Sequence, residues 1–340
     1  MKTPGLPAVV AALSFIVAPW SVADGSSVPD TMRAAAIDRG DDILALSIHP
    51  LPVPKPNAGE VLIAVNAAGV GVWQATYRPR DTQDTQFPVI PGSDGAGVIA
   101  AVGTGVHGFK VGDQVYGTHA AFYAEYVTIR AEDVAHVPKG INSTEAGILG
   151  ISGLSALQGI DDVLNLKAGE KLIIHGAAGG VGTLAVQFAK LRGVKVLATV
   201  SDDAGAALVS RLGTDVVVNG RTGDIGAAAR GFAPDGVDAV LGLAGGDALE
   251  RCIDALRRDN RGRVAYLYGL DPLPRPRFGI RMTLYSFISG PRELERLNKA
   301  VEAAKLQVPI AAEYSLADAA EAHKRLAAGH LLGKIVIRVR

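Results

Sequence analysis

The chain has 340 residues, of which 48% are hydrophobic and 20% charged, and it contains 41 glycines. This length allows two domains, and the composition is typical of a globular protein and excludes a disordered one. Lys plus Arg and Asp plus Glu each total 34, so no net charge favours nucleic acid, and we expect a small-molecule partner. The single cysteine, Cys252, excludes an internal disulfide and a cysteine-rich zinc site.

The first 23 residues differ from the rest of the chain. Lys2 precedes an apolar run from Leu6 to Trp20, and Ser21-Val22-Ala23 then has the small-x-small pattern of a cleavage site. This order predicts a signal peptide over residues 1–23 and export to the periplasm, which we favour. The run is too short and too interrupted by proline for a stable membrane span. The alternative is a cytoplasmic protein whose translation starts at Met32, where a first strand is predicted.

Short apolar runs broken by glycine and proline follow from Met32 to about Thr128. Such spacing predicts an irregular β-barrel-like domain over residues 32–150. The clearest strand candidates are Glu60–Val65, Gly97–Val102, Gln114–Tyr116 and Ala124–Thr128.

The pattern changes after Lys139. The polar segment Asn142 to Glu145 predicts a helix start, and strands then alternate with helices at the spacing of βαβ units, which predicts a doubly wound parallel sheet over residues 151–290. The last segment, 309–340, ends in a strand candidate that is expected to rejoin the first domain, which is therefore discontinuous. The strand candidates are Lys171–His175, Lys195–Val200, Asp215–Asn219, Ala239–Gly242, Val264–Leu267 and Gly333–Val339.

The strongest local motif is a glycine-rich turn between the strand Lys171–His175 and the helix Thr183–Lys190. Such a turn lets the backbone approach a pyrophosphate, and the helix amides face its negative charge. The alternative is that the glycines only permit a tight turn. Ala177 stands where the NAD-type fingerprint opens with glycine. The expected cofactor contacts are Gly176, Ala178, Gly179, Gly180, Val181 and Gly182.

The end of the second predicted strand bears on the choice of nucleotide. An acidic residue here would bind the ribose 2′-hydroxyl of NADH, but Ser201 stands 19 positions after Gly182 and its neutral hydroxyl favours NADPH. NADH stays possible because Asp202 and Asp203 follow directly. Arg221 is a candidate phosphate contact, and Ser201 has the alternative role of a helix N-cap.

Several further motifs occur in the order seen in one known family. Over nearly all of residues 32–340 the chain resembles the zinc-free quinone oxidoreductases, the zeta-crystallin-like family of the medium-chain dehydrogenase/reductase superfamily. The resemblance implies a GroES-like catalytic domain beside a Rossmann domain. The motifs are Pro52–Pro56, Gly59–Ile63, Ala67–Val70, Pro91–Gly97, Val111–Gly117 and Gly176–Gly182.

The same resemblance implies hydride transfer from NADPH to a quinone or other conjugated carbonyl acceptor. Alternatives are an enoyl or alkenal double-bond reductase, and a nucleotide-binding protein with little catalysis. A homodimer is a further possibility. Zinc-dependent members carry a cysteine and a histidine where this chain has Gly71 and Ser93, and the seven histidines have no ligand spacing, so we expect no metal site.

The expected acceptor contacts depart from the family pattern. Relatives have Gly-Val-Asn-Pro-x-Asp where this chain has Gly69 to Gln74. Trp73 is a candidate for stacking on a flat ring, and Gln74 or Tyr77 for donating a hydrogen bond, although packing is an equal alternative for Trp73 and Tyr77. The resemblance also places Ser155, Ala244, Gly245 and Lys334 beside the cofactor, whereas the family's lysine and tyrosine near the phosphate are Gly205 and Gly220 here.

Overall fold

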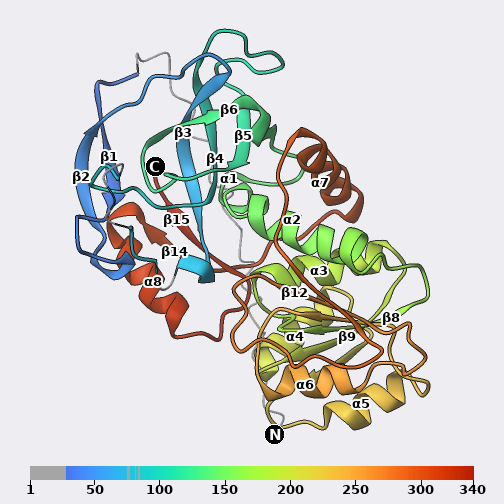
Figure 1. Ribbon diagram of the computed structural model, residues 1–340. Coiled ribbons are helices and arrows are strands. Elements are labelled where there is room, and N and C mark those ends of the chain that lie inside the picture. The colour runs from blue at the N-terminus through green and yellow to red at the C-terminus, as the bar shows by residue number, and fades with distance from the viewer. Residues whose placement is uncertain (1–27, 75–76, 81, 83–84) are drawn as a thin grey trace, which may run out of the picture.

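The computed structural model describes residues 28–74, 77–80, 82 and 85–340, so the predicted signal peptide lies outside the described residues. The chain forms two lobes, each built on its own large sheet (Figure 1). Among the helices of the described ranges, none has the length and apolar character needed to cross a membrane.

The first lobe contains a seven-stranded sheet whose central strand is β3 (Glu60–Val70), an apolar run that is buried along almost its whole length. It pairs antiparallel with β4 and β15, so the end of the chain completes the sheet. Helix α8 (Ala319–Ala327) packs beside β14 and β15, and β1 (Thr31–Ala36) forms a separate ribbon with β2 (Ser47–Pro52). The other strands are β4 (Asp94–Val102), β5 (Gln114–Thr118), β6 (Tyr126–Arg130), β7 (Val134–His136), β14 (Ile310–Ser315) and β15 (Lys334–Arg338).

The second lobe contains a six-stranded sheet in the order β10-β9-β8-β11-β12-β13, with every pair parallel. This is the doubly wound Rossmann arrangement, which confirms the predicted fold class. Its strands are β8 (Lys171–His175), β9 (Lys195–Val200), β10 (Val216–Asn219), β11 (Ala239–Gly242), β12 (Arg263–Leu267) and β13 (Arg281–Tyr285). Its helices are α3 (Gly180–Leu191), α4 (Asp203–Arg211), α5 (Ile225–Phe232) and α6 (Asp247–Asp254), and α7 (Pro291–Ala304) packs on the lobe junction.

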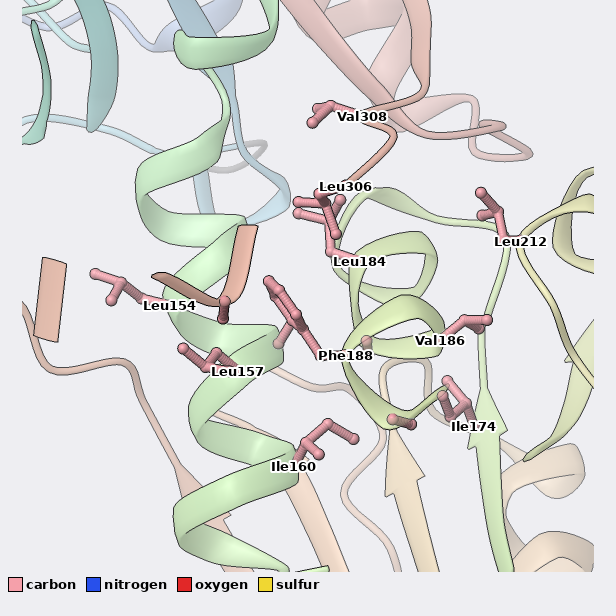
Figure 2. Close-up of a cluster of buried hydrophobic side chains, with 14 of the residues drawn as sticks. Leu154, Leu157, Ile160, Ile174, Leu184, Val186, Phe188, Leu212, Leu306 and Val308 are labelled. Carbon is pink, nitrogen blue, oxygen red and sulfur yellow. The ribbon is translucent and has the colours of Figure 1, made fainter. Parts of the chain in front are cut away.

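Helix α2 (Leu149–Gln158) lies between the two sheets, and all ten of its residues are buried. It contacts β4 and β5 on one side and α3 on the other. Leu154, Leu157 and Ile160, from this helix and the π-helical turn after it, belong to the same buried hydrophobic cluster as Phe188 of α3, and Figure 2 shows Ile160 on the side that faces α3. Burying a side chain of this size stabilises the fold by about 1.5–3 kcal/mol. The packing therefore fixes α2, and every polar group that it carries, against both lobes.

The short helix before α2 is the predicted polar helix start. Helix α1 (Ser143–Ala146) begins at Asn142, whose side chain accepts a hydrogen bond from the Glu145 amide, while Glu145 in turn accepts from the Asn142 amide. This reciprocal capping box satisfies two amides that a helix start would otherwise leave without partners.

Candidate cofactor and acceptor site

The glycine-rich turn joins β8 to α3 at the carboxyl edge of the six-stranded sheet. Helix α3 has Gly179 as its N-cap and no side-chain cap, so its first-turn amides remain available to an anion. A Cβ at Gly182 would overlap the carbonyl oxygen of Gly176 and would lie 2.7 Å from Cα of Ala177, so the turn closes only with glycine there. The backbone thus forms a cradle that fits a pyrophosphate.

Lys334 reaches this cradle from the other lobe. The Gly333 amide donates to the Ala178 carbonyl at 2.8 Å, which ties the start of β15 to the glycine turn. The Lys334 stem then passes over the start of α3, where a Cβ at Gly180 would lie 2.8 Å from Cδ of the lysine. Its ammonium donates to Oγ of Ser152 on α2 at 3.0 Å. A buried ammonium therefore stands beside the uncapped amides at the start of α3.

Asp94, at the start of β4, is the acidic counterpart of Lys334. Its side chain is fully buried, and Oδ2 accepts a hydrogen bond from the Ile151 amide at 3.3 Å. Within the described part of the chain, Oδ1 has no hydrogen-bond partner. Burial raises the pKa of the Asp94 carboxyl and lowers the pKa of Lys334, and in both cases the opposite charge of the other residue counteracts part of the shift.

The Trp73 indole lies over Gly71 and against Ser93, the two positions where zinc-dependent members carry ligands. A Cβ at Gly71 would overlap the indole carbons, so only glycine leaves room for the ring in this position. Nε1 of Trp73 donates to Oγ of Ser93 at 3.3 Å, and the Lys334 ammonium lies 4.8 Å from the ring centroid. The residue as a whole is 42% exposed, so the indole is not enclosed.

Gln74 is buried and uses its amide inside the protein. Its Oε1 accepts from the Gly71 amide at 3.1 Å, and its Nε2 donates to Ser93 at 3.3 Å. Behind it, the Tyr123 hydroxyl donates to Oε1 at 3.3 Å and contacts Nε2 of His323 at 3.1 Å. Burial lowers the pKa of His323 to about 4, so this histidine is neutral near neutral pH. The network holds the loop that carries Trp73.

Tyr77 lies outside this network. Its backbone carbonyl accepts from the Ile43 amide at 3.1 Å, its amide donates to the Gln74 carbonyl, and its side chain is 39% exposed. In the part of the chain that the structure describes, no hydrogen bond or ring contact connects the Tyr77 phenol with Trp73 or Ser93.

Ser201 follows β9 at the same edge of the sheet. The N-cap of α4 is Asp202, which accepts from the Gly205 amide at 2.7 Å, so the alternative interpretation of Ser201 as the cap is wrong. Asp202 is the cap because it lies directly before Asp203, the first residue of the helix, and its carboxylate can accept a hydrogen bond from the first turn. Ser201 donates to Asp202 at 3.3 Å, and its carbonyl accepts from Asn219 at 3.5 Å.

Arg221 connects this edge with the first lobe. Its amide donates to the Asn219 side chain at 2.9 Å, and its guanidinium lies 2.8 Å from Nε2 of His330. Asn219 and His330 were not predicted as site residues. Asn219 was detectable in principle, because it is the last residue of a strand at the carboxyl edge of a parallel sheet. His330 had no such signal.

The remaining predicted cofactor contacts lie at strand ends or on α2. Ser155 is buried on α2, and its carbonyl accepts from the Tyr285 hydroxyl at 2.9 Å. Ala244 and Gly245 follow β11, and Gly245 passes so close to the Pro272 carbonyl that a Cβ would lie 2.6 Å from its oxygen. Nearby, His175 ends β8 and contacts Oγ1 of Thr199 at 2.6 Å, and burial lowers its pKa to about 4.

Two further residues complete the set that the sequence did not reveal, Asp94 and Ser152. Across the described ranges, no three His, Cys, Asp or Glu side chains stand close enough together to hold a metal ion. The polar groups that do converge at the lobe junction are an ammonium, a carboxyl group and hydroxyls, which suit a bound nucleotide better than a metal.

Comparisons with known proteins agree with this architecture. The family profile described as alcohol dehydrogenase GroES-like domain matches residues 57–139, and the one described as zinc-binding dehydrogenase matches residues 212–337. The human quinone oxidoreductase is 30% identical over 324 residues, covering 90% of this chain and 97% of the human protein.

Solved structures include a quinone oxidoreductase from Coxiella burnetii, 27% identical with a TM-score of 0.77. A mycobacterial protein solved in complex with NADPH is 29% identical with a TM-score of 0.79. Each comparison covers 91% of this chain and 100% of the other. The chain is therefore a member of the quinone oxidoreductase family within the medium-chain dehydrogenase/reductase superfamily, an oxidoreductase by descent and by fold.

Proposed function

We propose that this chain is a zinc-independent, NADPH-dependent reductase that transfers hydride to a quinone or another conjugated carbonyl compound. One observation carries the proposal: Lys334 of the first lobe lies over the uncapped start of α3 in the second, next to Trp73. A dinucleotide held there lies between the lobes, with the acceptor beside it. The structure of a related mycobacterial protein in complex with NADPH supports the choice of cofactor.

Each part of the cofactor has proposed contacts in this arrangement. Gly176, Ala178, Gly179, Gly180, Val181 and Gly182 line the pyrophosphate, which accepts from the uncapped amides at the start of α3, and Lys334 supplies the opposite charge. Ser201 and Arg221 lie at the ribose end, where Asn219 holds both in place. Ser155, Ala244 and Gly245 lie toward the nicotinamide.

The bound cofactor supplies the hydride. The residues of this chain bind and orient the acceptor. Without a metal to polarise a carbonyl, the acceptor itself has to be electron-poor, which fits a quinone or an enone. Trp73 offers a flat surface for such an acceptor, and Gln74 acts as a positioning residue because its amide is already bonded to Gly71 and Ser93.

Steady-state kinetics with purified protein test this function. We expect oxidation of NADPH, faster than of NADH, with menadione or methyl vinyl ketone, and unchanged rates after dialysis against EDTA. Faster turnover of the enone than of the quinone would favour the double-bond reductase. Cofactor binding without oxidation by any acceptor would instead favour a nucleotide-binding protein, and stoichiometric zinc required for activity would contradict zinc independence.

For the cellular location, we keep export through residues 1–23 as the favoured proposal and a cytoplasmic start at Met32 as the alternative. Export raises a chemical problem, because the periplasm is not expected to hold a pool of free NADPH. N-terminal sequencing of the native protein distinguishes the two. We also propose a homodimer, since the edge of the second sheet exposes several apolar side chains.

A further inference from the structure

Trp73 is held by Gly71, Ser93 and Lys334, of which Gly71 departs from the family pattern. Gly71 stands where relatives have asparagine, and only its lack of a side chain lets the indole lie where it does. Ser93 accepts the indole hydrogen bond, and Lys334 places its ammonium over the ring. Because the residue as a whole is 42% exposed, the indole combines fixed contacts with incomplete enclosure.

The Lys334 side chain lies between the start of α3 and the Trp73 ring. Its alkyl stem lies across the first residue of α3. Its ammonium donates a hydrogen bond to Ser152 and lies over the Trp73 ring. An ammonium is attracted much more strongly to a phosphate oxygen than to an aromatic ring. A pyrophosphate on the α3 amides therefore competes with the indole for the same charge. The fully buried Asp94 keeps the lysine in this region of the junction by attraction of opposite charges.

We propose that the Lys334 ammonium covers the Trp73 ring in the free protein, that the cofactor pyrophosphate draws it away, and that the uncovered indole selects flat aromatic acceptors. This inference rests on the proposed function and extends it by naming the acceptor class. It also predicts that the cofactor binds before the acceptor. An electron-rich indole stacks best on an electron-poor ring system such as a naphthoquinone, whereas a small linear enone offers little surface for stacking.

Fluorescence tests the movement of the lysine. The chain has two tryptophans, so Trp20→Phe in the full-length protein leaves Trp73 as the single emitter. Oxidised cofactor, NADP⁺, should change the Trp73 emission. In Lys334→Met, which keeps the apolar stem without the charge, the free protein should already emit like the parent with cofactor.

Lys299→Met is the matched control, since Lys299 is exposed on α7 and paired with its helix neighbour Glu295. It should respond to NADP⁺ like the parent. Two results would overturn the movement: Trp73 emission that saturating NADP⁺ leaves unchanged, or a free Lys334→Met protein that emits like the free parent.

Kinetics test the selection of the acceptor. Trp73→Leu should lower kcat/KM for menadione by about tenfold and for methyl vinyl ketone by less than about threefold, whereas Trp73→Phe should keep most of the quinone activity. Equal losses on both acceptors would refute the selection while leaving the reductase function intact. Failure of the unsubstituted protein to oxidise NADPH with either acceptor would refute the proposed function itself.

Discussion

A glycine inside a helix is unfavourable unless the missing side chain makes room for something else. Gly182, in the first turn of α3, meets that condition, because a Cβ there would overlap the Gly176 carbonyl oxygen. This oxygen and the nearby Cα of Ala177 belong to the backbone, so neither moves aside easily. We predict that Gly182→Ala lowers the free energy of unfolding by about 1–3 kcal/mol and weakens NADPH binding, as measured by urea denaturation and by cofactor titration.

The matched control is Gly231, a glycine in α5 where an added Cβ would meet no other atom within 4 Å. Gly231→Ala should raise the free energy of unfolding by about 0.5–1 kcal/mol and leave cofactor binding unchanged. Similar behaviour of the two alanine variants would show that close approach at Gly182 has no role.

Buried histidines predict how stability depends on pH. Burial lowers the pKa of His323 from its ordinary 6.5 to about 4. Between these two values the unfolded chain binds a proton that the folded protein does not, so stability rises with pH across this window and is lost as pH falls from 6.5 to 4. We expect a loss on the order of 1–3 kcal/mol from this residue, measured by denaturant titration at several pH values.

The slope of that dependence is the decisive quantity. His323→Gln should flatten it, even if the variant is less stable at every pH because its contact with Tyr123 is altered. His175, with a pKa also lowered to about 4, should contribute a similar slope. An unchanged slope in His323→Gln would argue against a neutral buried imidazole.

At the scale of elements, the packing of α2 on α3 holds the site together. Phe188 is fully buried in the hydrophobic cluster that α2 and α3 share with the turn after α2, where Ile160 lies on the side facing α3 (Figure 2). Phe188→Ala should lower the free energy of unfolding by about 3–5 kcal/mol, because it leaves a cavity that fixed helices cannot close. Phe188→Leu retains most of the apolar volume and should cost only about 1 kcal/mol. Equal losses in urea denaturation would contradict this packing argument.

Elements with local signals were predictable from the sequence. The strand at Lys171–His175, the glycine turn after it and the polar helix start at Asn142 all formed as expected, since each depends on neighbouring residues. Strand β13 was missed. Of its five residues, Arg281 to Tyr285, only the last is buried, so they lack the apolar run of a central strand and form by pairing with β12.

Only part of the candidate site was predictable from the sequence, because several of its residues meet only when the whole chain has folded. The glycine turn is one continuous segment, and a resemblance pointed to Lys334. By contrast, the contacts among Lys334, Ser152 and Trp73 join segments that are far apart in the sequence. Asp94 could be recognised as a buried carboxyl group only after β4 and α2 were placed side by side.

Association of two copies is the last prediction, and it concerns the free edge of the second sheet. In the described structure β13 pairs only with β12, and its Leu284 is 45% exposed. Tyr268, Phe278 and Ile288 nearby are exposed at 76%, 107% and 68%, more apolar surface than a solvated edge normally keeps. Pairing of β13 with the same strand of a second copy covers this surface and satisfies the edge amides.

Leu284→Lys should therefore weaken the dimer by about 2 kcal/mol, roughly thirtyfold in Kd, because a lysine on the edge opposes pairing. Light scattering over a concentration series measures this, with Val111→Lys as the control, since Val111 is an exposed apolar residue of the first lobe. A monomeric parent, or a Leu284→Lys protein that dimerises like the parent, would place the association elsewhere or exclude it. If the prediction holds, the two sheets join into one that runs through both copies.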